Sequence, residues 1–527
     1  MKRHTTREAL KQYVASFNST DEETIVQAIP NAQAEEWLMK HIPRVLLPEP
    51  MLEQTYYFRW WLFRKHIKHT PDGTVITEFH PDVPWAGKHN TIVASGCHHI
   101  DEGRWLHDTS ILDEYITFFY RGGASLRSYS NWLEHAVLGL CEVRGETALG
   151  VKLLPDMVKN HAGWDEANLH SSGLYWSNDD RDASEFSISG NGLRPTLNCY
   201  QYANEKAIAA FARSKGELET ADCFDRRAQM LGDKINDVLW REEDRFYKVL
   251  PLENRNDRMP MGPVDPRRNA REIWGYLPWL FGAAPEGRAD AFRQLLDMNG
   301  FRTAWGMTTA ERRHPGFGLF YTGEELNAWR LSRDEKPVGP KGHECLWNGP
   351  SWPFSTCMAL KALSNLLVSG EKQEAVNASD YLHLLAQYAG AHVRKLENGA
   401  FIPWLDENMN PDTGDWIART RLMTWEDGHW SKDKGGYERG KDYNHSTYCD
   451  LVIGGLFGVR PTLDRVRIAP LFPAQWPYAV MEDLKVHGHD IIIQYENPCL
   501  GGAGYHIYVD RGCVFHTQTP QPFEMEL

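Results

Sequence analysis

The sequence predicts a mainly α fold, an (α/α)6 toroid with a small C-terminal antiparallel β module, and three observations support this. First, helical periodicity recurs along the chain in stretches that lie next to one another in pairs, about twelve in all, the count that six hairpins need. Second, no short-period repeat occurs, which favours a closed barrel over an open solenoid. Third, the pattern after Gly458 changes to short runs of period two, punctuated by Gly and Pro, which is typical of strands.

Apolar residues three or four positions apart mark the expected helices. Pro195 stands at a favourable first-turn position of one helix, and Gly370 terminates another. A further helix is expected after the loop that starts at Trp85. The other ranges are 110–121, 126–144, 148–162, 195–213, 217–240, 270–282, 286–298, 324–333, 352–370, 373–397 and 444–457.

These patterns divide the chain into three parts. Residues 1–84 are expected to form a helical and strand-bearing lead-in, of which 50–80 covers or plugs part of the barrel. Residues 85–457 form the barrel itself. Residues 458–527 form a β-sandwich-like module that caps it.

Composition limits the classes of function. The 527 residues carry a formal net charge of −14, which argues against a nucleic-acid partner and allows a neutral small molecule such as a sugar. No apolar run is long enough for a membrane span, and the N-terminus has no apolar signal core. Nine cysteines lack CxxC spacing, which suggests reduced thiols in the cytoplasm and no metal. We expect no cofactor, and the sequence does not indicate an oligomeric state.

The stretch from Trp347 to Gly370 is the most informative in the chain. Its first half is aromatic and rich in Gly and Pro, which predicts a rigid loop, and its second half is a periodic helix. Trp347 and Trp352 offer flat apolar faces to a sugar ring, and Asn348 can reach hydroxyl groups. The alternative is that these tryptophans are core packing, as most single tryptophans are.

The pattern W-x-G-P-x-W-P in this loop resembles a motif of the glycoside hydrolase family 63 group, six-hairpin barrel glycosidases related to mannosylglycerate hydrolases and trehalases. The chain keeps Trp347, Gly349, Pro350, Trp352 and Pro353. Asn348 departs from the family, which has Arg there. The resemblance implies an inverting glycosidase that acts on a small, α-linked glycoside with an Asp general acid and a Glu general base. Inversion would separate the two carboxyl groups by roughly 6.5–9.5 Å.

An acidic cluster is the first candidate for the general acid. It comprises Asp179, Asp180, Arg181 and Asp182, with Glu185 close behind. Crowded carboxylates raise at least one pKa, which suits a proton donor, whereas Arg181 opposes that effect. A capping or salt-bridge cluster is the alternative.

The segment around this cluster resembles the family's S-G-x-D…R…D-L-N-x-Y segment, whose Asp is the acid. Tyr175 occupies the position of that Asp. The resemblance therefore implies that the acid has moved to Asp180 or Asp179, and the sequence does not separate the two or exclude Asp182.

Glu407 is the candidate base, because E-N-M-N-P-D-T-G matches the family's E-x-x-x-P-x-T-G spacing. Two other readings stay open, a plain turn and a calcium loop with oxygen ligands at alternate positions from Asp406 to Asp412. Pro411 stands where such a loop needs Gly, and Ile417 occupies the twelfth position in place of an acid.

Other residues in polar or aromatic loops are candidates for substrate binding, although each alone is more often structural. Asn90 stands where the family has Asp in a first rim loop, so that match is loose. The full set is Trp85, Asn90, Trp176, Arg181, Asp182, Asn198, Trp347, Asn348, Gly349, Trp352, Tyr443 and His445.

Two other functions remain open. A sugar epimerase or lyase on the same toroid would use His and Tyr on carbon-bound protons, with Glu407 turned away. A carbohydrate-binding protein without activity would keep the aromatic rim and lack the acid, as the residue Tyr175 suggests. Phosphate-binding loops, dinucleotide fingerprints and nucleophile elbows do not occur in the sequence.

Overall fold

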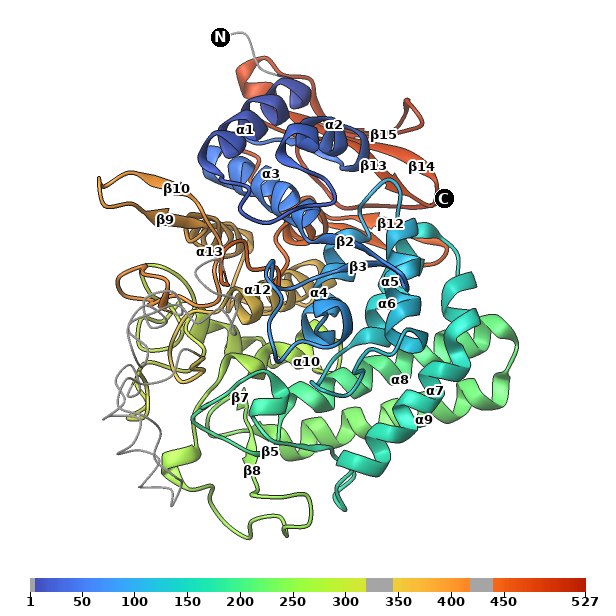
Figure 1. Cartoon of the computed structure of the whole chain (residues 1–527), viewed down its shortest axis with the longest axis vertical. Helices are drawn as coiled ribbons and strands as arrows, with labels where there is room; N and C mark the ends of the chain where they lie inside the picture. The colour runs from blue at the N-terminus through green and yellow to red at the C-terminus, as the bar shows by residue number, and fades with distance from the viewer. Residues whose placement is uncertain (1–4, 319–344, 418–438) are drawn as a thin grey trace.

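The structure is a computed structural model that describes residues 5–318, 345–417 and 439–527. Its core is a ring of helices with a sheet module packed against one side (Figure 1). The predicted helix at 324–333 lies outside the described residues. No helix in the described ranges has both the length and the apolar composition needed to cross a membrane.

Within the described residues, six helical segments follow one another around the inner layer of the toroid, each in contact with the next. They are α4 (Val93–Gly103), α6 (Leu133–Arg144), α8 (Pro195–Lys215), α10 (Leu277–Leu280), α12 (Pro353–Ser369) and η9 (Leu451–Leu456). Glu102 of α4 accepts hydrogen bonds from the backbone N–H groups of Cys449 and Asp450, just before η9, and so closes the ring.

A second layer of helices surrounds this ring. Its described members are α3 (Pro50–Lys65), α5 (Ser110–Arg121), α7 (Ala148–Asn168), α9 (Leu218–Lys234), η6 (Ala289–Leu295) and α13 (Ala378–Gly390). The pairs α6–α7, α8–α9 and α12–α13 are consecutive in sequence and in contact. The predicted (α/α)6 fold is therefore confirmed.

The expected helix ends at α8 and α12 are also found. Proline occupies the first turn of both helices, where its missing N–H costs nothing. Gly216 and Gly370 follow the last turns with φ of 83° and 87°, in the left-handed region that favours glycine. Between residues 270 and 298 the chain instead forms short 3₁₀ and α turns, among them η5 (Ile273–Tyr276), because Pro and Gly interrupt the pattern.

The N-terminal segment takes part in both the helical layers and the sheet module. Helices α1 (Thr6–Thr20) and α2 (Asn31–His41) precede a strand, β1 (Arg44–Leu46). Helix α3 is buried along most of its length and contacts α13 of the outer layer. The sequence-based boundary at residue 84 stays a prediction.

Most of the described strands form small sheets. The strands between the helices are β2 (Ile67–Thr70), β3 (Gly73–Ile76), β4 (Trp176–Ser177), β5 (Gly192–Leu193), β6 (Trp240–Arg241), β7 (Phe246–Tyr247), β8 (Leu250–Pro251), β9 (Val393–Lys395) and β10 (Phe401–Pro403). The C-terminal strands are β11 (Val459–Pro461), β12 (Arg465–Ile468), β13 (Tyr478–Val486), β14 (His489–Glu496), β15 (Gly504–Val509), β16 (Gly512–Thr517) and β17 (Phe523–Glu526).

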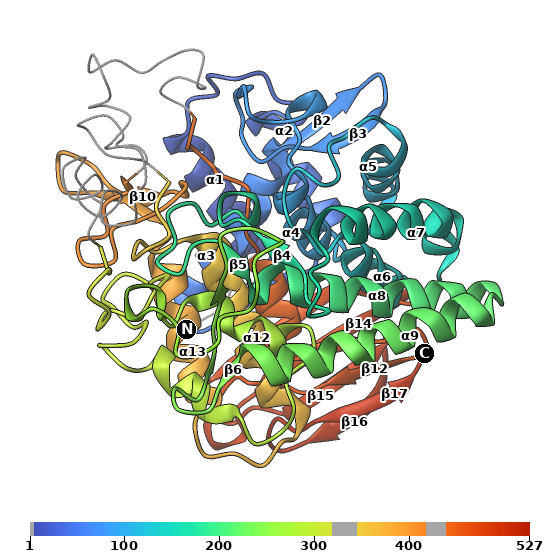
Figure 2. The ribbon, with the colours of Figure 1, turned by 90° about the horizontal axis from the view of Figure 1, so that it is seen from below.

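The C-terminal strands form two antiparallel sheets on one side of the helices (Figure 2). One has the order β11–β12–β17, and the other the order β1–β13–β14–β15–β16. Strand β1 comes from the N-terminal segment and pairs Leu46 with Val480. The predicted C-terminal antiparallel module is confirmed, and its larger sheet gains an edge strand from the start of the chain.

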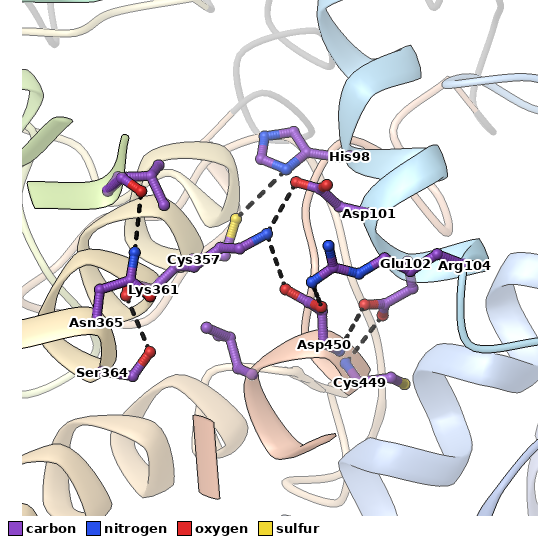
Figure 3. Close-up of polar contacts among 12 residues, drawn as sticks. His98, Asp101, Glu102, Arg104, Cys357, Lys361, Ser364, Asn365, Cys449 and Asp450 are labelled. Carbon is purple, nitrogen blue, oxygen red and sulfur yellow. Dashed lines mark hydrogen bonds and ion pairs between the residues drawn. The ribbon is translucent and has the colours of Figure 1, made fainter. Parts of the chain in front are cut away.

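A buried ionic cluster links three members of the inner ring, α4, α12 and η9 (Figure 3). Lys361 Nζ lies 2.9 Å from both Asp101 Oδ2 and Asp450 Oδ2, and Arg104 Nη2 lies 2.6 Å from Asp450 Oδ1. Burial alone raises the pKa of Asp450, but the charges of Arg104 and Lys361 outweigh it and hold that pKa below its usual range. The cluster therefore joins segments that are far apart in sequence.

Candidate active site

A cavity of about 370 Å³ opens among the loops that lead into the inner helices. Its walls combine aromatic rings with three carboxyl groups. The lining residues are Glu78, Phe79, Trp85, Ile92, Ala94, Ser95, Tyr129, Ala183, Glu185, Cys345, Trp347, Trp352, Phe354, Glu407, Arg439, Tyr443 and His445. A volume of this size and a mixed apolar and polar wall are typical of a small-molecule site.

Glu407, one of the three carboxyl groups, accepts hydrogen bonds from two side chains. Arg439 Nη2 donates a hydrogen bond to Glu407 Oε2 at 2.6 Å, and the Cys345 thiol donates to Oε1 at 3.2 Å. Both Glu407 and Arg439 are buried. A guanidinium at this distance stabilises the ionised carboxylate and fixes its orientation.

Glu185 is half-buried in the loop that follows the predicted acidic cluster. Burial raises the pKa of Glu185 well above its usual range, and the negative charges of Asp180, Glu407 and Asp179 raise it further. The backbone N–H of Trp347 donates a hydrogen bond to the Glu185 carbonyl oxygen at 3.1 Å, which connects this loop to the tryptophan loop. Glu185 is thus a carboxyl group that retains its proton at higher pH than an exposed glutamate.

The third carboxyl group, Glu78, follows strand β3 and accepts a hydrogen bond from the Tyr443 phenol. Burial raises the pKa of Glu78 to about 7, against the lowering effect of its hydrogen bonds with Tyr443 and Ser95. The ring of Tyr443 lies edge-on to His445, with centroids 3.9 Å apart. The cavity thus contains a buried phenol–carboxyl pair in addition to Glu185 and Glu407.

Stacked indoles form one wall. The rings of Trp347 and Trp352 are 4.3 Å apart at 14°, and Trp274 stacks behind Trp347 at 5.0 Å. Trp85 is 39% exposed, and Arg439 lies over its ring at 5.1 Å. The tryptophans serve both as core packing and as cavity wall, so the two interpretations of this loop apply together.

The structure brings part of the predicted site together. The predicted residues on the cavity wall are Glu407, Trp85, Trp347, Trp352, Tyr443 and His445. The predicted residues that do not line it are Asp179, Asp180, Arg181, Asp182, Trp176, Asn90, Asn198, Asn348 and Gly349.

The predicted acids are held away from the cavity by their own turn. Asp182 Oδ2 accepts from buried Arg194 Nε at 2.7 Å, and the Ser187 hydroxyl donates to Asp179 at 3.2 Å. After the 3₁₀ turn η2 (Asp180–Asp182), Ala183 takes a left-handed conformation with φ of 52°, and the chain turns so that Ala183 and Glu185 line the cavity.

Four other predicted binding residues make structural hydrogen bonds instead. The Asn90 side chain bonds to the backbone of Phe79, Pro81 and Val83, and the Asn198 side chain bonds to the backbone of Tyr175 and Arg194. The Trp176 indole donates to the Leu252 carbonyl at 3.0 Å, and the Gly349 N–H donates to the Thr309 hydroxyl at 3.0 Å. Asn348 is fully buried behind the wall.

Sequence reasoning missed Glu78, Tyr129 and Arg439 and gave Glu185 no role. Glu78 follows a short strand, and no motif marks it. Burial and then the charges of Asp180 and Asp179 raise the pKa of Glu185, which lies next to the cluster, whereas within the cluster burial raises the pKa of Asp182. Among the described residues, no group of three or more His, Cys, Asp or Glu side chains is arranged to hold a metal ion.

A ring of paired helices around a cavity lined by tryptophans and carboxyl groups defines the class of helical-barrel glycosidases. The chain belongs to the mannosylglycerate hydrolase MGH1-like glycoside hydrolase family, whose profile matches residues 88–446.

Solved structures extend this comparison. The chain resembles a structure titled sialidase, with 31% identity and a TM-score of 0.84, over 98% of this chain and 44% of that one. It therefore spans less than half of that protein. An α-L-rhamnosidase from Dictyoglumus thermophilum shares the fold, with 10% identity and a TM-score of 0.51, over 91% of this chain and 45% of that one. The family 63 mannosylglycerate hydrolase from Thermus thermophilus matches with 12% identity and a TM-score of 0.47, over 70% of this chain and 98% of that one.

Proposed function

We propose that the chain hydrolyses a small glycoside in this cavity, with Glu185 as general acid and Glu407 as general base. The supporting observation is that the two carboxyl groups line one tryptophan-walled cavity in opposite electrostatic environments. A glycosidase needs one carboxyl group that keeps its proton and one that stays ionised. Burial and acidic neighbours favour the proton on Glu185, whereas Arg439 favours the charge on Glu407.

In this mechanism Glu185 donates its proton to the glycosidic oxygen as the bond to the anomeric carbon breaks. Glu407 takes a proton from a water molecule, whose oxygen attacks the opposite face of the sugar. The product has the inverted anomeric configuration. Trp347 and Trp352 supply the apolar surface against which the sugar ring packs. An α-linked glycoside remains the substrate we expect, in keeping with the family resemblance.

A second candidate is hydrolysis of a sialoside with retention of configuration, and the Tyr443–Glu78 pair favours it. Sialidases are an exception to the two-carboxylate scheme because they use a tyrosine nucleophile. Here the Tyr443 oxygen would attack the anomeric carbon while Glu78 takes the phenol proton and Glu185 protonates the leaving oxygen; water would then release the sugar. The 31% identity to a structure titled sialidase supports testing this substrate.

The test is a panel of aryl glycosides that includes an aryl sialoside, with the product anomer followed by NMR. We expect Glu185→Gln to lower kcat by about 10²–10⁴-fold, the usual contribution of general acid catalysis. The loss should be smaller with a leaving group that needs no proton, such as dinitrophenol. Glu407→Gln should abolish hydrolysis, and inversion of the anomer is expected.

Asp180→Asn is the matched control, because Asp180 lies close to Glu185 but not on the cavity wall. Its activity should stay within a few-fold of the wild type. Loss of activity in Asp180→Asn with full activity in Glu185→Gln would contradict this assignment and indicate that the general acid lies in the predicted cluster. Retention of configuration together with an inactive Tyr443→Phe variant would favour the sialoside mechanism.

A further inference from the structure

A second depression, of about 660 Å³, lies beside the cavity and has a different chemical character. We call it the arginine groove. It is lined by residues of the 124–130 segment, by Ser177 and Arg181, and by Trp164 and Asn168 of helix α7. None of these lining residues is acidic.

The arginine groove and the cavity share two walls. Tyr129 lines the cavity, whereas Ser128 and Ser130 on either side of it line the groove. Similarly, Ala183 lines the cavity and Arg181 lines the groove. The Ser130 N–H donates to the Arg181 carbonyl at 2.9 Å, which joins the two segments. The two depressions therefore adjoin along these two segments.

Two exposed guanidinium groups, those of Arg127 and Arg181, give the groove its charge. Arg181 Nη1 donates to the Ser128 carbonyl at 3.2 Å, and Arg127 Nη1 donates to Asn160 Oδ1 at 3.3 Å. These are neutral acceptors, and neither arginine forms an ion pair within the described ranges. On a chain with net charge −14, these two cations line a groove whose own lining residues carry no carboxylate; Asp180 and Asp182 flank Arg181 in the chain, and Asp182 is paired with Arg194.

The position of Arg127 depends on a glycine. A Cβ atom placed on Gly163 would lie 2.6 Å from Arg127 Cζ, so the guanidinium packs directly against the backbone of α7. Trp164 beside it is 4% exposed, and its indole N–H has no hydrogen-bond partner among the described residues. The Ser128 hydroxyl donates to the Ser125 carbonyl at 2.8 Å and the Ser177 hydroxyl donates to the Asn178 carbonyl at 2.9 Å, so these oxygens remain as acceptors in the groove.

We propose that the arginine groove binds the carboxylate of an acidic sugar in an oligosaccharide whose neighbouring sugar occupies the cavity. The inference rests on the proposed function of that cavity. A guanidinium forms paired, charge-assisted hydrogen bonds with a planar carboxylate, which suits a uronic acid. The serine hydroxyls can bond to sugar hydroxyls. The cavity would then select the sugar to be cleaved, and the groove would select acidic glycans over neutral ones.

The test is isothermal titration calorimetry with tetragalacturonate as the acidic probe and maltotetraose as the neutral one, on Glu407→Gln protein. We expect tetragalacturonate to bind more tightly than maltotetraose and to weaken as salt rises. Arg127→Gln and Arg181→Gln should each weaken its binding about 5–10-fold, as expected for one charge-assisted bond at an exposed site. Gly163→Ala should act like Arg127→Gln because it displaces that guanidinium.

Arg511→Gln, in the turn between β15 and β16, is the matched control and should bind like the parent protein. Equal affinity for the two oligosaccharides, no binding of tetragalacturonate, or full binding by the Arg127→Gln/Arg181→Gln double variant would overturn the proposal. Hydrolysis of the aryl glycosides is assayed separately on the wild type. A protein that binds tetragalacturonate through these arginines but hydrolyses no glycoside would overturn the proposed function and leave the groove assignment standing.

Discussion

The cavity shows how position sets the chemistry of a single residue type. Glu78, Glu185 and Glu407 are all glutamates, yet one bonds to a phenol, one has acidic neighbours and one pairs with a guanidinium. Each neighbour changes the free energy of ionisation in a different direction or by a different amount. Sequence spacing singled out Glu407 as a candidate because its motif lies within one loop, whereas Glu185 and Glu78 acquire their environments from distant segments.

Glu78 provides a test of this environment through protein stability. Its pKa is raised from 4.5 to about 7, so the folded state retains a proton that the unfolded state has already lost between those pH values. The folded state loses relative stability as pH rises through that window, by about 3 kcal/mol at about 1.4 kcal/mol per pKa unit. Urea unfolding of wild type and Glu78→Gln is measured from pH 4.5 to 7.5. The difference between their free energies of unfolding should change by about this amount, with the wild type losing stability relative to the variant as pH rises.

The control for this measurement is Glu166→Gln, at an exposed position on helix α7. Its stability should follow that of the wild type at every pH. If Glu78→Gln showed the same pH dependence as the wild type, the raised pKa of Glu78 would be wrong.

At the scale of elements, the sequence predicted helix bounds best where residues at both ends of the helix mark its start and its end. Helices α8 and α12 begin with proline and end at glycine, and the sequence placed both well. Between residues 270 and 298 the predicted pair of helices becomes short turns. Pro and Gly interrupt the helical pattern there, so tertiary contacts decide the local structure. Strand β1 has three residues and no local signal, because its partner lies near the other end of the chain.

The last inner helix depends on a cap from a distant helix, which makes a second prediction. Glu102 accepts hydrogen bonds from three successive backbone N–H groups, those of Tyr448, Cys449 and Asp450, at 2.9–3.1 Å. Glu102→Ala would leave these buried donors unpaired, at about 1–3 kcal/mol each if no water replaces it. We expect the free energy of unfolding to fall by at least about 3 kcal/mol in urea denaturation, with faster amide exchange at residues 448–450.

Glu102→Gln keeps the shape and one acceptor oxygen, so its loss should be less than half as large. Similar stabilities for wild type and Glu102→Ala would show that the carboxylate does not hold the start of this helix.

For the whole molecule, the sequence predicted the architecture because toroid and sheet differ in periodicity along their full lengths. It could not predict how the parts join. The ring closes through Glu102 and the Asp101–Lys361–Asp450 cluster, whose members come from three separate helices. The larger sheet is completed by a strand from the N-terminal segment. Such contacts have no signature in a local window of sequence.

The pairing of β1 with β13 predicts a specific cross-link. Leu46 lies opposite Val480, and directly opposed side chains on antiparallel strands are close enough for a disulfide. Leu46→Cys/Val480→Cys should form a bond on mild oxidation, detected by altered mobility in non-reducing gels. The exposed Cys223, Cys499 and Cys513 are replaced by serine beforehand.

Leu46→Cys/Ala479→Cys is the paired control, because neighbouring side chains of a strand point to opposite faces. It should remain reduced under the same conditions. Equal cross-linking of both pairs would disprove the register.

The strand that completes the larger sheet also sets an order of events during synthesis. Residues 44–46 are translated before the toroid, but residues 478–486, their hydrogen-bonding partners, are translated only after it. Strand β1 therefore waits with an unpaired edge while the toroid is translated, so this sheet is assembled only after the helices of the toroid have been made.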